Sequence, residues 1–511
     1  MASTQVSLTD LPPEILLLIG EMVDGNAVIL QFMLTSKMLY DLLLPRLYRA
    51  MSLQTNKACN GAMNVFLKYP DRCQHILMLA LYPNSIPGAW PRKTLPAVLS
   101  ERWLALRITC LFALRLVNLR SFVWDGEDYP ADELWIVLKG MCPQLTSVSC
   151  TTRQREIPAG CSLFNFDNLT EFGMHVSIGG PVTIGIGRGP LPQELLDMLI
   201  LRCPNLVALT LRLFESAHTL TELDRVMRSY FPELRSVCME IFVCRSDPLR
   251  CQPLSAALST FLSTHPNLSH VSILPYILQA DATANLLSDR EWPSIVDSTA
   301  PLPNLWSFVG VWELFSQFHH AANRLQALNL TGAPVVESTA EKVYLRLQAL
   351  PELKSLDIRL SSPALFEGIV VACPRLVHLR VIISSTFGQQ KTAKSIVRAV
   401  QQLPRLRSFA LLKKPRTLVE QSMLRFALVL LARNVGIEEL NLGWLDWKLG
   451  IRIKDGMYTV TRDENGQRHL DVRERGIGLW NHGSFDRRFR MKLEQKLPRV
   501  YKNRRIVHLT L

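Results

Sequence analysis

One short pattern recurs along most of this 511-residue chain and limits the folds that the chain can adopt. An apolar residue is followed by two residues, a second apolar residue, one residue and a third apolar residue. In the strongest copies a proline stands two residues before the first position. These copies begin at Leu145, Leu206, Leu234, Leu268, Leu305, Leu353, Leu376 and Leu406. Repetition of this kind is typical of proteins in which each structural unit is stabilised by its neighbours.

Weaker copies without the proline fill the gaps between the strong ones. They begin at Ile76, Leu119, Leu169, Leu325, Ile437 and Ile506. Between Ile76 and Ile437 the copies follow one another at about 30 residues on average, a spacing found in solenoid repeats. A chain of 511 residues is too long for one compact domain of ~100–200 residues, so a long repetitive array accounts for its length.

Helical patterns stand between the copies, and all but the last stop at or just before a proline, which fits the steric restriction on the residue before a proline. They cover residues 193–203, 254–264, 341–350, 364–373, 394–403 and 422–434. A short extended segment then follows, such as residues 206–211, in which alternation places Leu209 and Leu211 on one face and Thr210 and Arg212 on the other. Helix–turn–strand units of this kind predict a parallel sheet with helices along its outer side.

These units resemble leucine-rich repeats of the long, irregular type, although they lack the usual asparagine after the strand. The resemblance implies an α/β solenoid with a parallel concave sheet and convex helices over residues 55–449. An ordinary doubly wound α/β domain is the alternative, but a single domain core does not require so many repeated steps.

The first fifty residues predict three short amphipathic helices. Thr9 or Asp10 can cap the first helix, and Pro12 or Pro13 fits its first turn. An apolar stripe at helical spacing follows, formed by Ile15, Leu16, Ile19 and Val23. A second helix is predicted over residues 28–34, and Ser36 caps a third that runs to residue 43. Helices this short hold little core of their own, so Leu8, Leu11 and Pro12 are expected to stay partly exposed and to favour a partner surface.

Residues 1–54 resemble an F-box. The match rests on Leu11–Pro12–x–Glu14–Ile15–Leu16–x–x–Ile19, on Ser36–Lys37–x–Leu39–Tyr40 and on Pro45–x–Leu47–Tyr48–Arg49, a form common in fungal F-box proteins. Gly20 departs from the larger residue usual there, at an expected cost of ~0.5–1 kcal/mol of helix stability. In that family the module binds the Skp adaptor of a cullin–RING ubiquitin ligase, and the repeats hold a protein substrate. A plain helical cap on the open end of the solenoid is the alternative.

The resemblance implies two sets of binding residues. The adaptor-binding set is Leu8, Leu11, Pro12, Ile15, Leu16 and Ile19. The substrate-binding set lies on the solvent face of the predicted strands and comprises Thr210, Arg212, Glu240, Asp357, Arg359 and Arg380. The excess of arginine in this second set favours an acidic or phosphorylated substrate segment, although ordinary soluble residues on an exposed sheet would look the same.

The C-terminal region is basic and predicts a different local structure. From residue 451 to the end, the 15 Lys/Arg exceed the 7 Asp/Glu. Alternating segments at 458–462 and 468–472 flank an Asn–Gly turn signal, which predicts a hairpin insertion over 450–483. Ser484 then caps a predicted helix with Phe485, Phe489, Leu493 and Leu497, and the pattern at Ile506 predicts a terminal repeat over 484–511. The arginines of this helix are interpreted as a solvated face. A nucleic-acid contact is the rarer reading, since no stacking or groove-reading motif accompanies it.

The sequence provides no signal for catalysis, for a cofactor or for a metal site. The 11 cysteines form no CxxC pair, and a Gly185–x–Gly187–x–Gly189 stretch lacks the Lys–Ser/Thr of a phosphate-binding loop. Apolar stretches are too short to cross a bilayer, and acidic residues near Leu11 argue against a secretory signal.

We therefore expect a non-catalytic, cytoplasmic or nuclear substrate receptor of an SCF-type ubiquitin ligase, with no membrane or nucleic-acid partner. A leucine-rich-repeat scaffold outside any ligase is the alternative.

Overall fold

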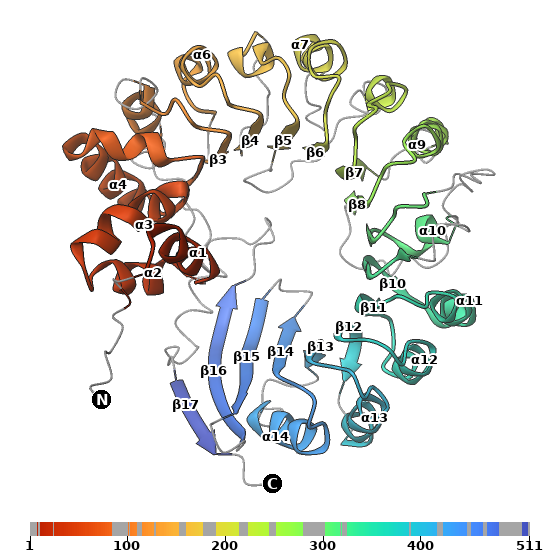
Figure 1. Ribbon diagram of the computed structural model, residues 1–511. Coiled ribbons are helices and arrows are strands. Elements are labelled where there is room, and N and C mark those ends of the chain that lie inside the picture. The colour runs from red at the N-terminus through yellow and green to blue at the C-terminus, as the bar shows by residue number, and fades with distance from the viewer. Residues whose placement is uncertain are drawn as a thin grey trace, which may run out of the picture. The chain divides into compact units, whose positions relative to one another are not determined.

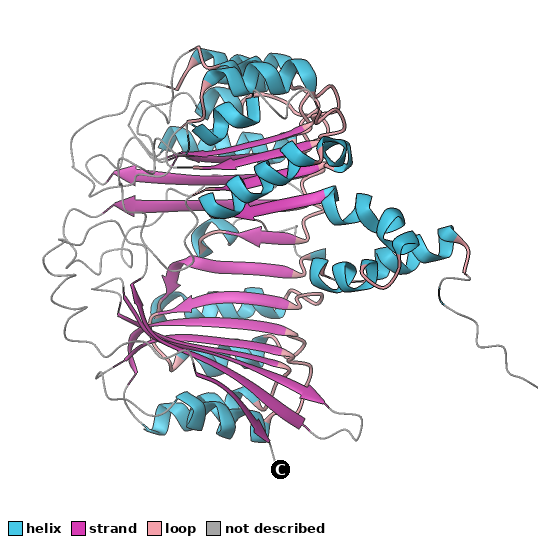
Figure 2. Ribbon diagram, turned by 90° about the vertical axis from the view of Figure 1, so that its left-hand side faces the viewer, coloured by secondary structure: helices cyan, strands magenta, loops and turns pink. Residues whose placement is uncertain are grey.

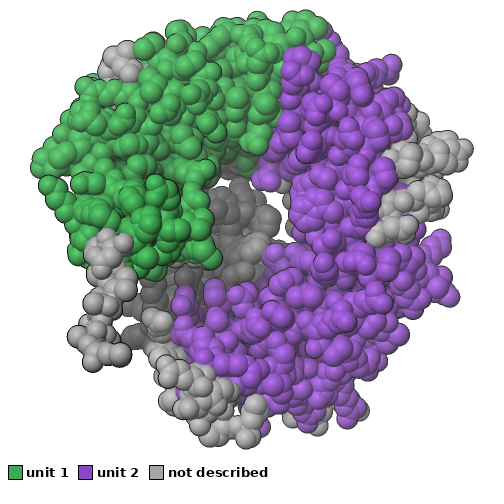
Figure 3. Space-filling model, in the orientation of Figure 1, with its two compact units in different colours: residues 1–86, 91–177, 192–203 green, residues 87–90, 178–191, 204–511 purple. Residues whose placement is uncertain are grey.

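Parallel strands with helices beside them make up most of the protein, as Figure 2 shows. The computed structural model describes residues 8, 11–23, 25–83, 101, 103–109, 115–126, 129–152, 160–176, 191–213, 223–244, 252–278, 302–316, 318, 324–387, 390–415, 423–446, 451–462, 468–479 and 503–508. The chain divides into two compact units (Figure 3). The first comprises residues 1–86, 91–177 and 192–203, and the second comprises residues 87–90, 178–191 and 204–511.

The first unit opens with three helices and continues into a parallel sheet. The helices are α1 (Pro13–Met22), α2 (Asn26–Met33) and α3 (Lys37–Arg49). The strands pair in chain order and all run parallel: β1 (Ala50–Gln54), β2 (Met78–Tyr82), β3 (Ser121–Asp125), β4 (Ser147–Thr152) and β5 (Glu171–Val176). Further helical segments of this unit include α4 (Asn56–Lys68), η2 (Pro70–His75), α6 (Asp132–Met141), η3 (Ser162–Asn165), α7 (Gln193–Asp197) and η4 (Met198–Arg202).

The second unit repeats the helix–strand step. Its parallel strands are β6 (Ala208–Leu213), β7 (Ser236–Cys244), β8 (His270–Leu278), β9 (Ser307–Val309), β10 (Ala327–Val335), β11 (Ser355–Leu360), β12 (His378–Phe387), β13 (Ser408–Pro415) and β14 (Glu439–Asp446). Its helices are α9 (Gln252–Thr264), α10 (Trp312–Phe315), α11 (Glu337–Gln348), α12 (Leu365–Ala372), α13 (Gln390–Val400) and α14 (Met423–Arg433). In Figure 1 the last four helices lie along one side of the strands that they connect.

The repeat pattern is aligned from strand to strand. Leu356 of β11 pairs with Leu379 of β12, which pairs with Phe409 of β13, which in turn pairs with Leu440 of β14. All four side chains are at most 2% exposed. Because equivalent apolar positions lie directly beside one another, neighbouring units share one continuous core. The predicted α/β repeat solenoid is confirmed.

The first apolar position of each copy is buried in both strong and weak copies. From Ile76 to Ile437 every such residue is at most 8% exposed. The turn before the strand is also repeated, because the N–H of this residue donates to the carbonyl three residues earlier, as from Leu268 to His265 and from Leu376 to Cys373. All six predicted helices are present with bounds that differ by a few residues, although residues 193–202 pass from an α-helix into a π-helical turn.

The C-terminal strands differ from the prediction. Strand β15 (Ile451–Arg462) and strand β16 (Arg468–Leu479) form the predicted hairpin. Strand β15 pairs directly with β14, so the hairpin continues the sheet of the repeats. Strand β17 (Asn503–His508), which contains Ile506, pairs antiparallel with β16. The predicted last repeat is therefore not a parallel one, because the apolar spacing at Ile506 marks an extended segment but not the direction in which it pairs.

The predicted domain boundaries also differ from the compact units. A division between residues 54 and 55 was expected, but the three helices and strands β1–β5 fall in one unit, and the solenoid is divided near residue 203. The Asn–Gly turn, the helix predicted after Ser484 and the glycine-rich stretch at 185–189 lie outside the described residues. None of the described helices is long and apolar enough to span a membrane.

Candidate protein-interaction surfaces

The three N-terminal helices, α1 to α3, form a small module, which we call the helical module. Pro12 occupies the N-cap of α1 without a side-chain hydrogen bond, while Thr9 and Asp10, the predicted caps, lie outside the described residues. Helix α3 has the predicted cap, because the Ser36 hydroxyl accepts a hydrogen bond from the backbone N–H of Leu39 at 3.2 Å. It also continues past Pro45 to Arg49, further than predicted.

A compact apolar cluster holds the helical module together. Ile29, Met33 and Leu43 are its buried residues, each at most 3% exposed. Helix α1 joins α3 at a close approach, since a Cβ added to Gly20 would lie 2.4 Å from a methyl carbon of Leu43. Arg46 of α3 donates to the backbone carbonyls of Glu21 and Val23 at 3.0 Å each, and so satisfies acceptors left open at the end of α1.

Much of the remaining apolar surface of the helical module is exposed. The exposed fractions are 44% for Leu8, 43% for Ile15, 41% for Leu17, 55% for Leu18, 78% for Met22, 50% for Val28, 43% for Leu30, 72% for Leu34 and 41% for Met38. Single exposed apolar residues are ordinary, but so many in one module of this size are typical of a protein-binding surface.

Five of the six predicted adaptor-binding residues are exposed or half-buried in the structure, and one is buried. Leu8, Pro12 and Ile15 are exposed, and Leu11 and Ile19 are half-buried. Leu16 is fully buried, so its predicted contact with an outside partner is wrong. Helix α1 carries apolar residues over most of its surface, and helical spacing alone does not decide which leucines turn inward. Sequence reasoning missed Leu17, Leu18 and Met22 for this reason. A helix with apolar residues on two sides nevertheless signals that one of these sides needs a partner.

An arginine connects the helical module to the following segment within the first unit. The Arg72 guanidinium, from η2, donates to the hydroxyl of Tyr48 at 2.7 Å and to that of Tyr40 at 3.0 Å. It also lies 4.2 Å from the ring centroid of Tyr69. Planar arginine suits this combination of two hydrogen bonds and ring stacking. The contacts hold α3 against the segment that leads into β2.

Charged and polar residues from neighbouring strands meet on one face of the second unit's sheet. This face, which we call the open face, is formed by the strand residues that alternate with the core positions. Asn329, Asp357 and Arg380 occupy one row across β10, β11 and β12. Arg380 lies 3.7 Å from the Asp357 carboxylate, and the Asn329 amide donates to the same carboxylate at 3.5 Å. Burial raises the pKa of the Asp357 carboxyl, and the positive charge of Arg380 opposes that rise. Asn329 was not predicted, because only strand register places it beside Asp357.

The other predicted substrate-binding residues form a second group. Thr210 and Arg212 lie on β6, half-buried, on the face opposite the buried Leu209 and Leu211, as predicted. The Arg212 guanidinium lies 3.9 Å from the Cys238 sulfur of β7. Arg212 is also in register with Glu240, whose side chain lies outside the described part of the structure. Strands β8 and β9 separate this group from the Asp357 row, so the predicted set is two groups and not one.

An apolar row runs beside the charged row. Arg359 of β11 pairs with Ile382 of β12, which pairs with Leu412 of β13. Ile382 and Leu412 alternate with core residues along their strands, yet they are only 8% and 5% exposed. Next to Leu412, Gly443 leaves room for the leucine, since a Cβ there would lie 2.4 Å from its methyl carbon. Sequence reasoning did not single out this pair.

The buried cysteines among the described residues are poorly suited to act as nucleophiles. Within the described ranges, no group of three or more histidine, cysteine or acidic side chains is placed to hold a metal ion. Burial raises the pKa of the Cys161 and Cys373 thiols to about 12, and that of Cys59 to about 11. At neutral pH such thiols remain protonated and are poor nucleophiles.

The architecture defines a class, a helix–strand repeat protein that carries an N-terminal helical module. A scan against protein-family models finds no match, and neither does a search of curated proteins. Among solved structures, the chain is similar to one in the crystal structure of the Rad7 and Elc1 complex in yeast. Identity is 14% with a TM-score of 0.35, over 74% of this chain and 93% of the other. A likeness at this level supports no assignment of function.

Proposed function

We propose that this chain is the substrate-recognition subunit of an SCF-type ubiquitin ligase, in the cytoplasm, the nucleus or both. The helical module binds the Skp adaptor and through it the cullin–RING complex, and the repeat sheet binds a protein substrate. The chain itself carries out no covalent chemistry. It holds the substrate near the charged conjugating enzyme, where a high effective concentration makes lysine attack nearly intramolecular.

The exposed apolar surface of the helical module is the observation that carries this proposal. Ile15, Leu18 and Met22 of α1 lie outside the module's own core and are 43%, 55% and 78% exposed. A partner that covers them removes apolar area from water at about 25 cal/mol per Å². The F-box resemblance of residues 1–54 favours the Skp adaptor as that partner. A helical cap that only closes the solenoid would not need this second apolar face.

The open face of the second unit's sheet favours a peptide or protein as the substrate. Its Asp357–Arg380 row offers hydrogen bonds and charge on a broad sheet face, which suits a peptide or protein better than a small molecule. Ile382 and Leu412 beside this row are only 8% and 5% exposed and add little apolar contact. Arg380 and Arg359 on this face favour an acidic or phosphorylated segment of the substrate.

Capture of purified Skp adaptor by the full-length chain tests the adaptor contact. We expect binding at micromolar concentrations or below, and a loss of at least about 100-fold when Ile15→Asp and Leu18→Asp are combined, because each charge would be desolvated in the interface. Both residues are exposed, so the double variant should fold. The matched control combines Leu345→Asp and Val371→Asp, which are 62% and 64% exposed in the repeats. This control should bind the adaptor as the unaltered chain does.

Two results would change the assignment. If the unaltered chain fails to capture the adaptor, the ligase role is excluded and a repeat scaffold is favoured. If the double variant still binds while its melting curve is unchanged, the adaptor does not use α1. For the substrate, co-purification from cells should lose specific partners on Arg359→Gln with Arg380→Gln, while capture of the adaptor persists.

A further inference from the structure

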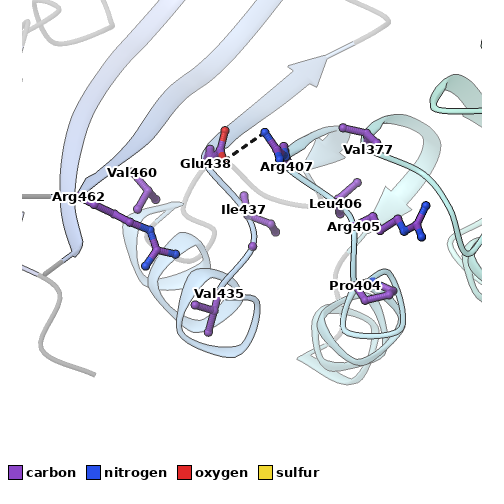
Figure 4. Close-up of a pocket in the computed structure, with 11 residues that line it drawn as sticks. Val377, Pro404, Arg405, Leu406, Arg407, Val435, Ile437, Glu438, Val460 and Arg462 are labelled. Atoms are coloured by element: carbon purple, nitrogen blue, oxygen red, sulfur yellow. Dashed lines mark ion pairs between the residues drawn. The ribbon is translucent and has the colours of Figure 1, made fainter. Parts of the chain in front are cut away.

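A surface pocket lies at the end of the second unit's sheet where strands β13 and β14 begin. It is formed by the turns that lead from α13 into β13 and from α14 into β14, together with the last residues of β15 (Figure 4). Its volume is about 580 Å³. Pockets of ~300–1,000 Å³ are the size that proteins use to enclose a ligand or a few side chains. The residues of the Asp357–Arg380 row, which runs across β10 to β12, do not line this pocket.

The charges around the pocket are unbalanced. Arg405, Arg407 and Arg462 line it, against a single carboxylate from Glu438. Arg407 lies 3.8 Å from Glu438, and both side chains are more than 60% exposed, so this ion pair is weak. Arg405 and Arg462 make no ion pair or hydrogen bond with any other described residue. The pocket therefore carries an excess of positive charge that favours an anionic ligand.

A buried arginine, Arg468, contacts a residue that lines the pocket but does not line the pocket itself. Arg462 is in register with Arg468 across the β15–β16 hairpin. Arg468 is only 6% exposed, and it donates to the carbonyl of Ile437, a residue that lines the pocket, at 3.4 Å. Its Nε atom is buried with no hydrogen-bond partner among the described residues. Like charges directly opposite each other destabilise a hairpin, and a bound anion would offset that repulsion.

The floor of the pocket is apolar. Leu406 and Ile437 are buried beneath it, and Val460 and the exposed Val435 form its sides. In Figure 4 the Arg462 side chain extends from the end of β15 toward Val435, and Arg405 lies on the opposite side. A free inorganic anion would leave this floor uncovered. A nucleic acid would call for stacking side chains, and no aromatic residue lines the pocket.

We propose that this pocket is a second protein-docking site, which binds an acidic peptide segment by seating one aliphatic side chain between flanking carboxylates. The aliphatic group covers Val435 and Ile437, and the carboxylates meet Arg405 and Arg462. None of the residues that line the pocket belongs to the helical module or to the Asp357–Arg380 row. Its test does not depend on the proposed ligase role, because a scaffold would use the same pocket.

A fluorescein-labelled peptide with one leucine between two runs of three glutamates is a suitable probe. We expect saturable binding by anisotropy to the full-length chain, weakening at least threefold between 50 and 200 mM salt, about as expected when two exposed charge pairs form. The combination of Arg405→Gln and Arg462→Gln should weaken binding at least tenfold, and so should Val435→Asp. The matched control, Arg324→Gln with Arg398→Gln, removes the same charge from exposed sites and should bind within twofold of the unaltered chain.

Several outcomes would overturn the proposal. One is equal binding of a peptide with glutamine in place of glutamate. Another is displacement of the probe by inorganic phosphate at the concentration of the peptide itself, which would indicate a simple anion site. A third is loss of binding on Arg359→Gln with Arg380→Gln but not on the pocket substitutions, which would place the peptide on the open face. Failure of the unaltered chain to bind at millimolar peptide also refutes it.

Discussion

Gly20 of α1 lies against Leu43 of α3 so closely that an added Cβ would stand 2.4 Å from a leucine methyl carbon. A glycine inside a helix costs ~0.5–1 kcal/mol relative to alanine, and here that cost allows the two helices to approach. Sequence comparison alone marks Gly20 as an unfavourable departure from the F-box pattern. The structure gives it a packing role.

We expect Gly20→Val to lower the free energy of unfolding of the helical module by about 2 kcal/mol, because the larger side chain overpacks a buried site. Gly20→Ala should have a smaller effect, since the gain in helix propensity partly offsets the clash. Thermal and urea unfolding of both variants, with adaptor capture as a second readout, checks this. If Gly20→Val is as stable as the unaltered chain, α1 and α3 lie further apart than the distance of 2.4 Å between an added Cβ and the Leu43 methyl carbon implies.

The contacts of Arg72 predict that its shape matters more than its charge. We expect Arg72→Lys to lose about 1–3 kcal/mol of stability in the first unit, because an ammonium group cannot reach both tyrosine hydroxyls and stack on Tyr69. Tyr40→Phe should cost about 1 kcal/mol by removing one hydrogen bond. A double-mutant cycle measures the coupling. As a control, Lys68→Ala, at the exposed end of α4, should change stability by less than ~0.5 kcal/mol; an Arg72→Lys chain as stable as this control would contradict the prediction.

His265 predicts that the repeats lose stability in mild acid. The ring is 2% exposed, its Nε2 accepts from the Phe231 N–H at 2.9 Å, and its Nδ1 lies 2.6 Å from the Phe261 carbonyl oxygen. These partners require a neutral ring with its proton on Nδ1. Burial lowers the pKa of His265, and the hydrogen bond to Phe261 opposes this only in part.

The direction in which stability changes with pH follows from the lowered pKa of His265. The unfolded chain binds the proton more tightly, so the contribution of His265 is complete above the unfolded pKa of ~6.5 and is lost as the pH falls through the folded pKa. We expect the melting temperature to fall between pH 7.5 and pH 5, and to fall less in His265→Phe. That variant should also be less stable at pH 7.5 by about 1–3 kcal/mol, because the Phe231 N–H loses its acceptor. An unchanged pH dependence in the variant would count against this role.

Cysteine labelling gives a test of burial across both units. Burial raises the pKa values of Cys142 and Cys73 to about 11, and both thiols are at most 2% exposed. We expect them to react with iodoacetamide at pH 7.5 at least ten times more slowly in the folded chain than in urea. Among the described cysteines, Cys238 is half-buried and should be labelled first. Peptide mass spectrometry measures each rate, and fast labelling of Cys142 in the folded chain would contradict its burial.

The repeat and the existence of the helical module are encoded locally and can be predicted from the sequence. The spacing of Leu353, Leu356 and Ile358 recurs in Leu376, Leu379 and Val381, and strand pairing places the strand residues among them side by side. Such a pattern can be read from the sequence because each unit is built from local signals. Side chains alternate between two faces in a strand, a helix turns every 3.6 residues, and a proline stands where a helix ends. The N-cap at Ser36 is local for the same reason.

Long-range packing determines which apolar residues face outward and which distant residues meet. Leu16 turns inward and Leu18 outward because α3 packs on one side of a helix that carries leucines on both sides. Strand β17 pairs antiparallel with β16, a direction that the apolar spacing at Ile506 does not encode. Arg405 and Arg462 border one pocket although nearly sixty residues separate them, since the register of the strands between them sets that distance. These features could be read only from the folded chain, because no local periodicity encodes contacts between residues so far apart in the sequence.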